Sequence, residues 1–381
     1  MQFDNITLLD DILRQEYISA RRFIYTVIAE PILQATQIKI PNTNEFPRDR
    51  GLRSGFDLQR FGELCGNREW FHSYHKITIH AENYLVHHIA PNTCIVGYEM
   101  PPWLTSTLDA HSIPWINIRL SPIRFGRDLY LVITDSLGEI PARVSEFLVK
   151  EEEIRLEAGL VRASILHNAP PKTNIENSKG RMIFIGQTSS DASIVSTHGS
   201  LLDVSSYKDA IIKLVGDREL LHKPHPYDRS WAKFERRRLQ EILGKSVKSI
   251  NDNIYKILSE GGDSSIMAIS SGVTQEAPFF GVPSITLYHP VCDISSPSSA
   301  HVRFIDFASP RFWAAIFDTQ RKLNTNAIKL NLEQENFMRR LHNAYWGYDE
   351  YLIQNNKFWN KVITHGAKEI MRKAFGRLLI F

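Results

Sequence analysis

The sequence predicts an α/β protein of two domains with a cleft between them. From Arg181 onward, short apolar runs alternate with helical stretches, a pattern typical of a parallel sheet built from βαβ units. Several predicted strands end in polar clusters, and ligands of open α/β sheets bind outside the carboxyl ends of the strands. A length of 381 residues exceeds one ordinary domain and fits two.

The chain divides into three expected parts. Residues 1–167 form a first α/β domain, and a polar, proline-rich segment at 167–180 reads as a linker. Residues 181–310 form a second α/β domain with a parallel sheet. Residues 311–381 are expected to be helical and to pack back on the first domain.

The periodicity of apolar residues places the individual elements. In the first domain it predicts strands at 76–80, 93–98 and 115–120, followed by a charged helix at 142–162. In the second domain it predicts five strands and four helices. The strands are at 182–185, 219–223, 246–250, 265–269 and 284–288, and the helices at 206–215, 230–243, 253–259 and 272–280.

Composition narrows the class of protein. The net charge of +3, from 45 basic and 42 acidic residues, is too even for nucleic acid to be the main partner. Three widely spaced cysteines form no disulfide framework or zinc pattern, which indicates a reducing cytoplasm. The N-terminus has no secretory signal, and no apolar stretch is long enough to span a membrane. A cytoplasmic location is therefore expected.

The C-terminal segment 358–381 predicts a basic amphipathic helix. Five basic residues and one acidic residue lie between Asn360 and Phe381, with apolar residues at a helical period. Such a helix can pack its apolar face on a domain core, or it can lie on an anionic membrane surface at the inner face of the cytoplasmic membrane. Both interpretations stay open on the sequence alone.

Ser270, Ser271, Gly272 and Thr274 open a predicted helix directly after a strand. The first turn of a helix has unpaired N–H groups and a partial positive charge, and small residues let a phosphate approach the backbone. The same residue types are also ordinary N-caps. The cluster predicts either a phosphate site or only a helix start.

The run from His222 to Pro226 is the most specific motif. Pro224 and Pro226 restrict the backbone on either side of His225. A fixed imidazole together with the ammonium of Lys223 suits binding of a phosphate or of a departing phosphate group. The alternative is a tight turn that carries surface histidines.

Carboxylates follow two further strands. Gln187 and Asp191 follow the strand at 182–185, where Asp191 is either a nucleophile or base, or a helix cap. Glu99 ends a nearly fully apolar strand, so burial is expected to raise its pKa toward a value useful for acid–base chemistry. The alternative is a glutamate paired with a neighbouring arginine, for which Arg119 and Arg124 are the candidates.

Several familiar motifs are absent from the sequence. There is no DxD, HExxH, CxxC, GxSxG, GxGxxG or P-loop pattern. Phosphate binding by basic side chains and helix starts is therefore favoured over binding through a metal. We expect no metal and no cofactor.

Three of these motifs, in their order along the chain, resemble those of the bacterial capsule and O-antigen β-Kdo (3-deoxy-D-manno-octulosonic acid) glycosyltransferases. They are Gly186-Gln187-Thr188 with Asp191, then Lys223-Pro224-His225-Pro226, and then Ser270-Ser271-Gly272. The resemblance is strongest over 181–290. It implies a modified GT-B fold of two Rossmann-like domains that face a cleft, the first on the acceptor side and the second binding the nucleotide sugar. The His-Pro pair is shared with bacterial sialyltransferases, which also use a CMP-activated acidic sugar.

The resemblance also implies a role for each matching residue. Asp191 corresponds to the catalytic carboxylate, Glu99 to a second acidic group, and His225 to a contact of the CMP phosphate. Gly272 and Thr274 complete the donor site, and Arg119 and Arg124 are candidates to bind the sugar carboxylate. The remaining donor-binding residues are Gln187, Lys223, Pro226, Ser270 and Ser271.

The function expected from the sequence is retaining transfer of Kdo from CMP-Kdo to a lipid-linked capsule or lipopolysaccharide O-antigen acceptor. One alternative is a sialyltransferase-like or other nucleotide-sugar transferase of GT-B fold. A second alternative is an inactive GT-B-like scaffold in polysaccharide assembly, because a fold alone does not establish an activity.

Overall fold

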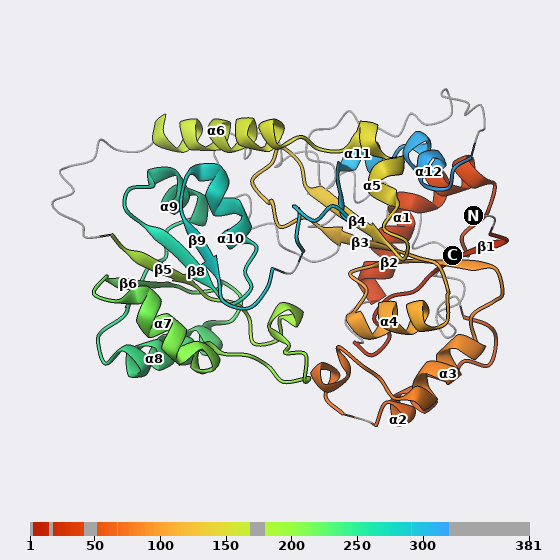
Figure 1. Cartoon of the computed structure of the whole chain (residues 1–381), viewed down its shortest axis with the longest axis horizontal. Helices are drawn as coiled ribbons and strands as arrows, with labels where there is room; N and C mark the ends of the chain where they lie inside the picture. The colour runs from red at the N-terminus through yellow and green to blue at the C-terminus, as the bar shows by residue number, and fades with distance from the viewer. Residues whose placement is uncertain are drawn as a thin grey trace, which may run out of the picture.

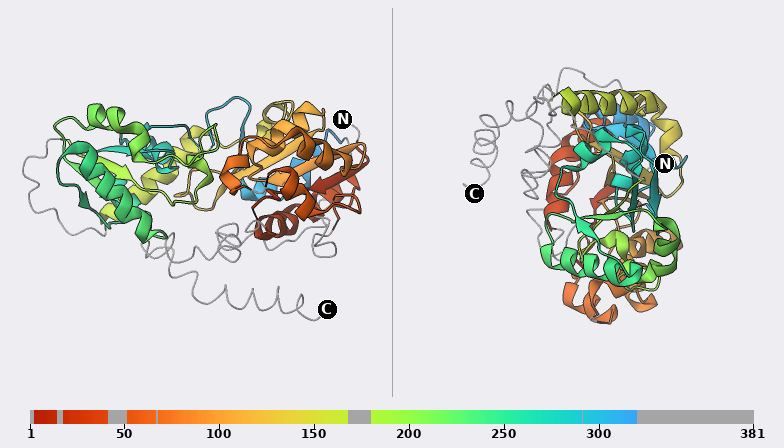
Figure 2. Two further views of the ribbon diagram at one scale, coloured as in Figure 1. Left: turned by 90° about the horizontal axis from the view of Figure 1, so that it is seen from below. Right: turned by 90° about the vertical axis from the view of Figure 1, so that its left-hand side faces the viewer.

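The structure is a computed structural model that describes residues 3–14, 18–41, 52–66, 68–167, 180–290 and 292–319. These residues form two α/β domains, each built on a five-stranded sheet (Figure 1). The domains lie side by side along the longest axis of the molecule (Figure 2). The expected α/β class is confirmed, since the described residues form two α/β domains, the second with an all-parallel sheet. No helix in the described ranges has the length and apolar character needed to cross a membrane.

The first sheet has the order β1-β2-β3-β4-β10. Strands β1 (Asn5–Leu8), β2 (Thr93–Tyr98) and β3 (Trp115–Leu120) are parallel, while β4 (Tyr130–Asp135) is antiparallel to both of its neighbours. Strand β2 is buried on both faces because its side chains alternate between two cores. One core contains α1 (Ile18–Thr36), and the other contains α2 (Leu58–Leu64), α3 (Ile79–His87) and α4 (Pro102–Ala110).

The second sheet has the order β7-β6-β5-β8-β9, and all its strands are parallel. Counted within the domain this order is 3-2-1-4-5, the doubly wound arrangement of Rossmann-type domains. The strands are β5 (Met182–Ile185), β6 (Leu220–Lys223), β7 (Lys248–Ser249), β8 (Ser265–Ala268) and β9 (Ser284–Thr286). The order reverses between β5 and β8, so a ligand is expected at the carboxyl ends of these two strands.

Helices cover both faces of this second sheet. Helices α7 (Lys208–Val215) and α8 (Arg229–Leu243) pack on one face, where Ile211, Val215 and Leu239 join the core. Helices α6 (Glu151–His167) and α9 (Ile254–Glu260) pack on the other face. Alternation of side chains along the strands, such as Phe184 toward one core and Ile185 toward the other, produces this layering.

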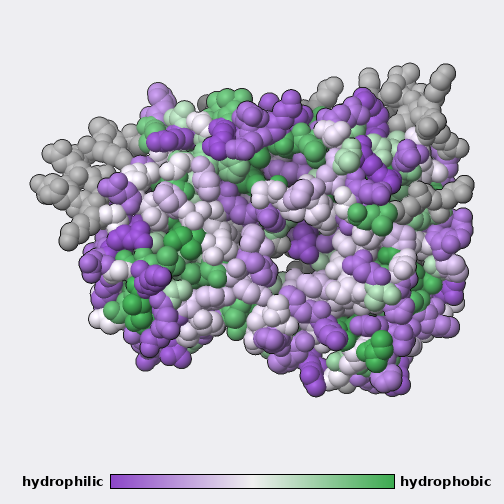
Figure 3. All heavy atoms as spheres, viewed as in Figure 1, coloured by the Kyte–Doolittle hydropathy of each residue, from purple (hydrophilic) through white to green (hydrophobic). Residues whose placement is uncertain are grey.

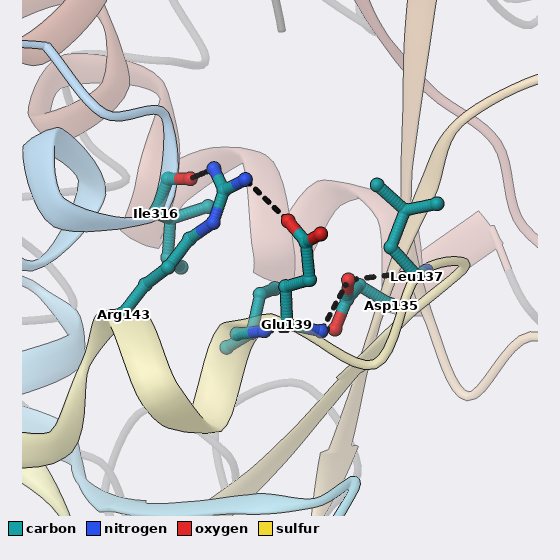
Figure 4. A network of polar contacts seen from close by, with 6 residues as sticks. Asp135, Leu137, Glu139, Arg143 and Ile316 are labelled. Carbon is teal, nitrogen blue, oxygen red and sulfur yellow. Dashed lines mark hydrogen bonds and ion pairs between the residues drawn. The ribbon is translucent and has the colours of Figure 1, made fainter.

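The chain returns to the first domain after β9. Strand β10 (Ala300–Arg303) pairs with β4, and α11 (Phe304–Phe307) and α12 (Pro310–Ile316) join the first core. The return is therefore earlier than the boundary at 310 expected from the sequence. Arg143, at the end of α5 (Ile140–Arg143), donates from Nη1 to the carbonyl of Ile316 at 2.9 Å and thereby holds the C-terminal end of α12 (Figure 4).

Two elements differ from the sequence-based expectation. The strand expected at 76–80 is instead the start of α3, because the Thr78 hydroxyl accepts from the Ala81 amide and caps a helix. The helix expected at 142–162 is broken, since the chain is extended where the Val149 amide donates to the carbonyl of His301 at 2.8 Å. The expected linker and the C-terminal helix at 358–381 lie largely outside the described residues, the latter entirely.

Candidate active site

Gln187 joins the two strand ends at the reversal of the second sheet. It follows β5, and its Oε1 accepts from the backbone amide of Ser270 after β8 at 2.8 Å. Its Nε2 donates to Asp191 Oδ2 at 3.2 Å and to Ser193 Oγ at 2.8 Å. Gln187 is buried, so these bonds fix the loops after both strands relative to each other.

Asp191 is held by two hydrogen bonds. It is the N-cap of a short 3₁₀ turn at Ala192–Ile194, where Oδ1 accepts from the Ser193 amide at 2.9 Å, while Oδ2 accepts from Gln187. The carboxylate is therefore a cap, as one sequence interpretation held. Each oxygen retains lone pairs and the side chain is partly exposed, so a fixed carboxylate also faces outward.

His225 and Lys223 lie at the end of the neighbouring strand β6. The Tyr227 amide donates to His225 Nδ1 at 3.3 Å, so the neutral imidazole carries its proton on Nε2 and can donate from there. Burial lowers the pKa of His225, although Asp191 acts in the opposite direction. Burial also lowers the pKa of Lys223. Pro226 follows in the same turn.

The cluster after β8 is more engaged in internal bonds than the sequence suggested. The Thr274 hydroxyl donates to the Ser271 carbonyl at 2.8 Å and lies 2.7 Å from the Thr286 hydroxyl, inside the domain. The helix that follows, α10 (Val273–Glu276), is only one turn long. A side chain on Gly272 would meet Pro122 of the first domain at 3.2 Å, so Gly272 lies at the contact between the domains.

Glu99 faces this site from the first domain. It follows β2 with a positive φ of 54°, a conformation that non-glycine residues adopt at a cost in backbone strain. Burial raises the pKa of Glu99, and the charge of Asp191 raises it further. The two carboxylates, one from each domain, are therefore close enough for their charges to act on each other.

Three arginines lie near enough to Glu99 for their charges to act on it. Arg119, Arg124 and Arg14 each lower its pKa, in opposition to burial. Arg119 donates from Nη2 to the carbonyl of Met100 at 3.0 Å, and the Arg124 amide donates to Glu276 Oε1 at 2.6 Å. The structure thus brings both expected arginines to the wall of the site.

Several residues in this wall were not found by sequence reasoning. The Arg14 guanidinium lies 4.2 Å from the Trp70 ring centre, and its Nη2 is 3.5 Å from the carbonyl of Ser190, next to Asp191. Asp11 accepts from Trp103 Nε1 at 3.4 Å, and burial raises its pKa to about 6. Asp10 and Asp11 follow the end of β1. Because ligands bind at the carboxyl ends of strands, the position of these two residues after a strand could have identified them as well.

Cys292 also lies beside this wall. Burial raises the pKa of its thiol to about 11, while Arg119 lowers it and Glu99 raises it. The thiol is therefore protonated at neutral pH and is not an activated nucleophile.

A direct contact between the domains closes one side of the site. His72 Nδ1 lies 2.8 Å from the carbonyl of Gly199, and His75 Nε2 lies 3.1 Å from the carbonyl of Val195. We call this contact the histidine seam. Figure 3 shows a hollow between the two domains with hydrophilic residues at its rim. Within the described part of the chain, no three histidine, cysteine or acidic side chains are grouped to hold a metal ion.

The chain matches no protein-family model and no curated protein sequence. Among solved structures, the β-Kdo 2,7 transferase and the β-Kdo 2,4 transferase of Thermosulfurimonas dismutans KpsC are similar to this chain. The first has 18% identity, a TM-score of 0.32 and coverage of 52% of this chain and 66% of its own. The second has 16% identity, a TM-score of 0.31 and coverage of 52% and 69%.

A third similar structure is the UDP-GlcNAc 2-epimerase of Methanocaldococcus jannaschii in complex with UDP-GlcNAc and UDP. It has 14% identity and a TM-score of 0.25, over 74% of this chain and 83% of that one. With TM-scores below 0.5, these three likenesses assign no activity to the chain.

Proposed function

We propose that this protein is a retaining glycosyltransferase that moves Kdo from CMP-Kdo to a lipid-linked polysaccharide acceptor of the capsule or O-antigen type. The observation that carries the proposal is that Asp191 follows β5 and the His225 turn follows the neighbouring strand β6, while the charge of Asp191 acts both on His225 and on Glu99 of the first domain. The sugar, the nucleotide and the acceptor come from the resemblance of the sequence motifs.

In the first step of the proposed reaction, an Asp191 oxygen attacks the anomeric carbon of Kdo and the bond from that carbon to the CMP phosphate oxygen breaks. Hydrogen bonds from Gln187 and the Ser193 amide orient the carboxylate for this attack. The departing phosphate takes the bonding electrons and is stabilised by His225 Nε2–H and by Lys223.

In the second step, the acceptor hydroxyl attacks the same carbon, the bond to Asp191 breaks, and the hydroxyl proton passes to Glu99. Burial raises the pKa of Glu99, which makes its carboxylate a stronger base toward the acceptor hydroxyl. Two displacements at one carbon give overall retention. Arg119 and Arg124, at the wall beside Glu99, are proposed to bind the sugar carboxylate.

The intact mass of the purified protein after incubation with CMP-Kdo tests the proposal, with CMP-sialic acid in parallel. A gain of one Kdo residue is expected, and it should disappear in Asp191→Asn. Asp203→Asn is a matched control, because Asp203 caps another 3₁₀ turn in the same way. Glu99→Gln should still form the adduct but transfer it slowly.

Other outcomes separate the alternatives. A sialic acid adduct would assign the protein to the sialyltransferase-like class. If no adduct forms with either donor, and Asp191→Asn leaves polysaccharide assembly intact in cells, the protein is a scaffold and the proposed activity is wrong.

A further inference from the structure

Helix α8 carries two carboxylates toward the loops of the candidate site. Asp228, its N-cap, accepts from the Ser189 amide at 3.1 Å and from the Ser189 hydroxyl at 2.7 Å. Glu235 lies seven residues further along the chain, on the same face of the helix. Its Oε2 is 2.7 Å from His222 Nε2. One helix therefore contacts both the loop that holds Asp191 and the strand that leads to His225.

The His222–Glu235 pair is fully enclosed. Exposed fractions are 1% for His222 and 3% for Glu235. Removing one partner would leave a buried polar group without its hydrogen bond, which is far more costly than losing an exposed contact. The two side chains must therefore stay together, and with them the elements that carry them.

The His222–Glu235 pair packs directly against the backbone at Gly186. A Cβ atom on Gly186 would overlap Glu235 Oε2, and it would lie 3.1 Å from His222 Nε2 and 3.4 Å from the His225 amide nitrogen. The pair thus fills the space beside the backbone of Gly186, the residue before Gln187. Gly186 begins the loop that leads to Asp191, and the backbone of His225 lies 3.4 Å from the same Cβ position.

We propose that Glu235 and Asp228 are positioning residues: through His222 and Ser189, helix α8 fixes the distance between Asp191 and His225. These carboxylates touch no reacting atom, and they act by holding the groups that do. The catalytic consequence rests on the proposed function, whereas the structural consequence for His225 does not.

The test compares Glu235→Ala, Glu235→Gln and a control, Leu239→Ala, in the full-length protein. Leu239 is buried on the same helix and packs in the helix–sheet core, and its side chain has no polar atom that could bond His222. Two quantities are measured: the dissociation constant for CMP, and the NMR resonance of the His225 imidazole, assigned with His225→Gln.

Glu235→Ala should shift the His225 resonance and weaken CMP binding by about tenfold or more, because small displacements of binding groups have large effects. Glu235→Gln, whose amide can still bond His222, should restore both within about threefold. Leu239→Ala should lower thermal stability but move neither quantity. A Glu235→Ala protein that behaves like Leu239→Ala, or a Glu235→Gln protein as impaired as Glu235→Ala, would overturn the inference.

A double-mutant comparison tests the contact at Gly186 directly. Gly186→Ala should weaken CMP binding by about tenfold in the wild-type background, but by less than about threefold when Glu235→Ala has removed the carboxylate it would strike. Equal effects in both backgrounds would contradict the geometry. If the wild-type protein binds no CMP, the proposed function fails, and the His225 resonance still decides the positioning role.

Discussion

The histidine seam between the domains can be tested by one added methyl group. Gly199 has a φ of 73°, and a Cβ there would lie 2.8 Å from the carbonyl oxygen of His72, 2.9 Å from its Cα and 3.1 Å from the carbonyl oxygen of Phe71. All three are backbone atoms of the first domain, so no side-chain rotation relieves the overlap. Gly199→Ala must therefore push the domains apart or strain both backbones.

The loss of stability in Gly199→Ala can be worked out from these contacts by comparison with a matched control, Gly281→Ala. Gly281 has a φ of 75°, and a Cβ there would meet nothing within 4 Å. Both substitutions cost about 1–2 kcal/mol in backbone strain. Only Gly199→Ala adds the overlap, which costs about 1–3 kcal/mol by analogy with overpacked cores.

The assay is thermal unfolding of the two variants under one set of conditions. Since 1 kcal/mol corresponds to about 2–4 °C for domains of this size, Gly199→Ala should melt about 6 °C below Gly281→Ala. Equal melting temperatures would refute the reasoning, because they would mean that the two backbones do not meet at the seam.

Three further predictions concern buried ionisable groups and the cap of α8. Burial raises the pKa of Glu276 from 4.5 to about 7, so between these pH values the folded state binds a proton that the unfolded state has released. The free energy of unfolding should therefore fall by about 3 kcal/mol as the pH rises from 4.5 to 7. In urea unfolding, Glu276→Gln should depend less on pH over this range than the wild-type protein. Burial lowers the pKa of His301 from 6.5 to about 4, so the free energy of unfolding should fall by about 3 kcal/mol as the pH falls from 6.5 to 4. His301→Phe should remove this loss of stability in acid. If urea unfolding of His301→Phe shows the same loss as the wild-type protein, the prediction is wrong. Asp228→Ala should lower the free energy of unfolding by about 1–2 kcal/mol, because it removes the N-cap of α8. Chemical denaturation should show a smaller loss for Asp228→Asn, since asparagine can also cap a helix.

The rule that polar clusters follow strands predicted much of the candidate site. Gln187, His225 and Ser270 were expected at one sheet edge because each follows a strand of the second domain, and the hydrogen bond from Ser270 to Gln187 confirms that two of these strand ends meet. A strand in a parallel sheet has a fixed direction, so its carboxyl end is known as soon as the strand is recognised.

Other features depended on packing between distant segments. Asp11 and Arg14 were missed because β1 is short and the strand that it pairs with in the described sheet, β2, lies almost 90 residues further along the chain. The return of β10 to the first sheet was missed for the same reason, since its pairing with β4 joins segments about 170 residues apart. The strand wrongly expected at 76–80 shows a local error, where a threonine cap outweighed the alternation of apolar and polar residues.

The sequence by itself determined the α/β class, the five strands of the second sheet and the polar groups at their ends, because these depend on local periodicity and strand direction. Only the tertiary structure decided which charges face one another. The approach of Glu99 to Asp191, the burial that raises the pKa of Glu99, and the enclosure of the His222–Glu235 pair all arise when separate segments exclude water together. Desolvation depends on every neighbour in space, and a linear pattern does not contain that information.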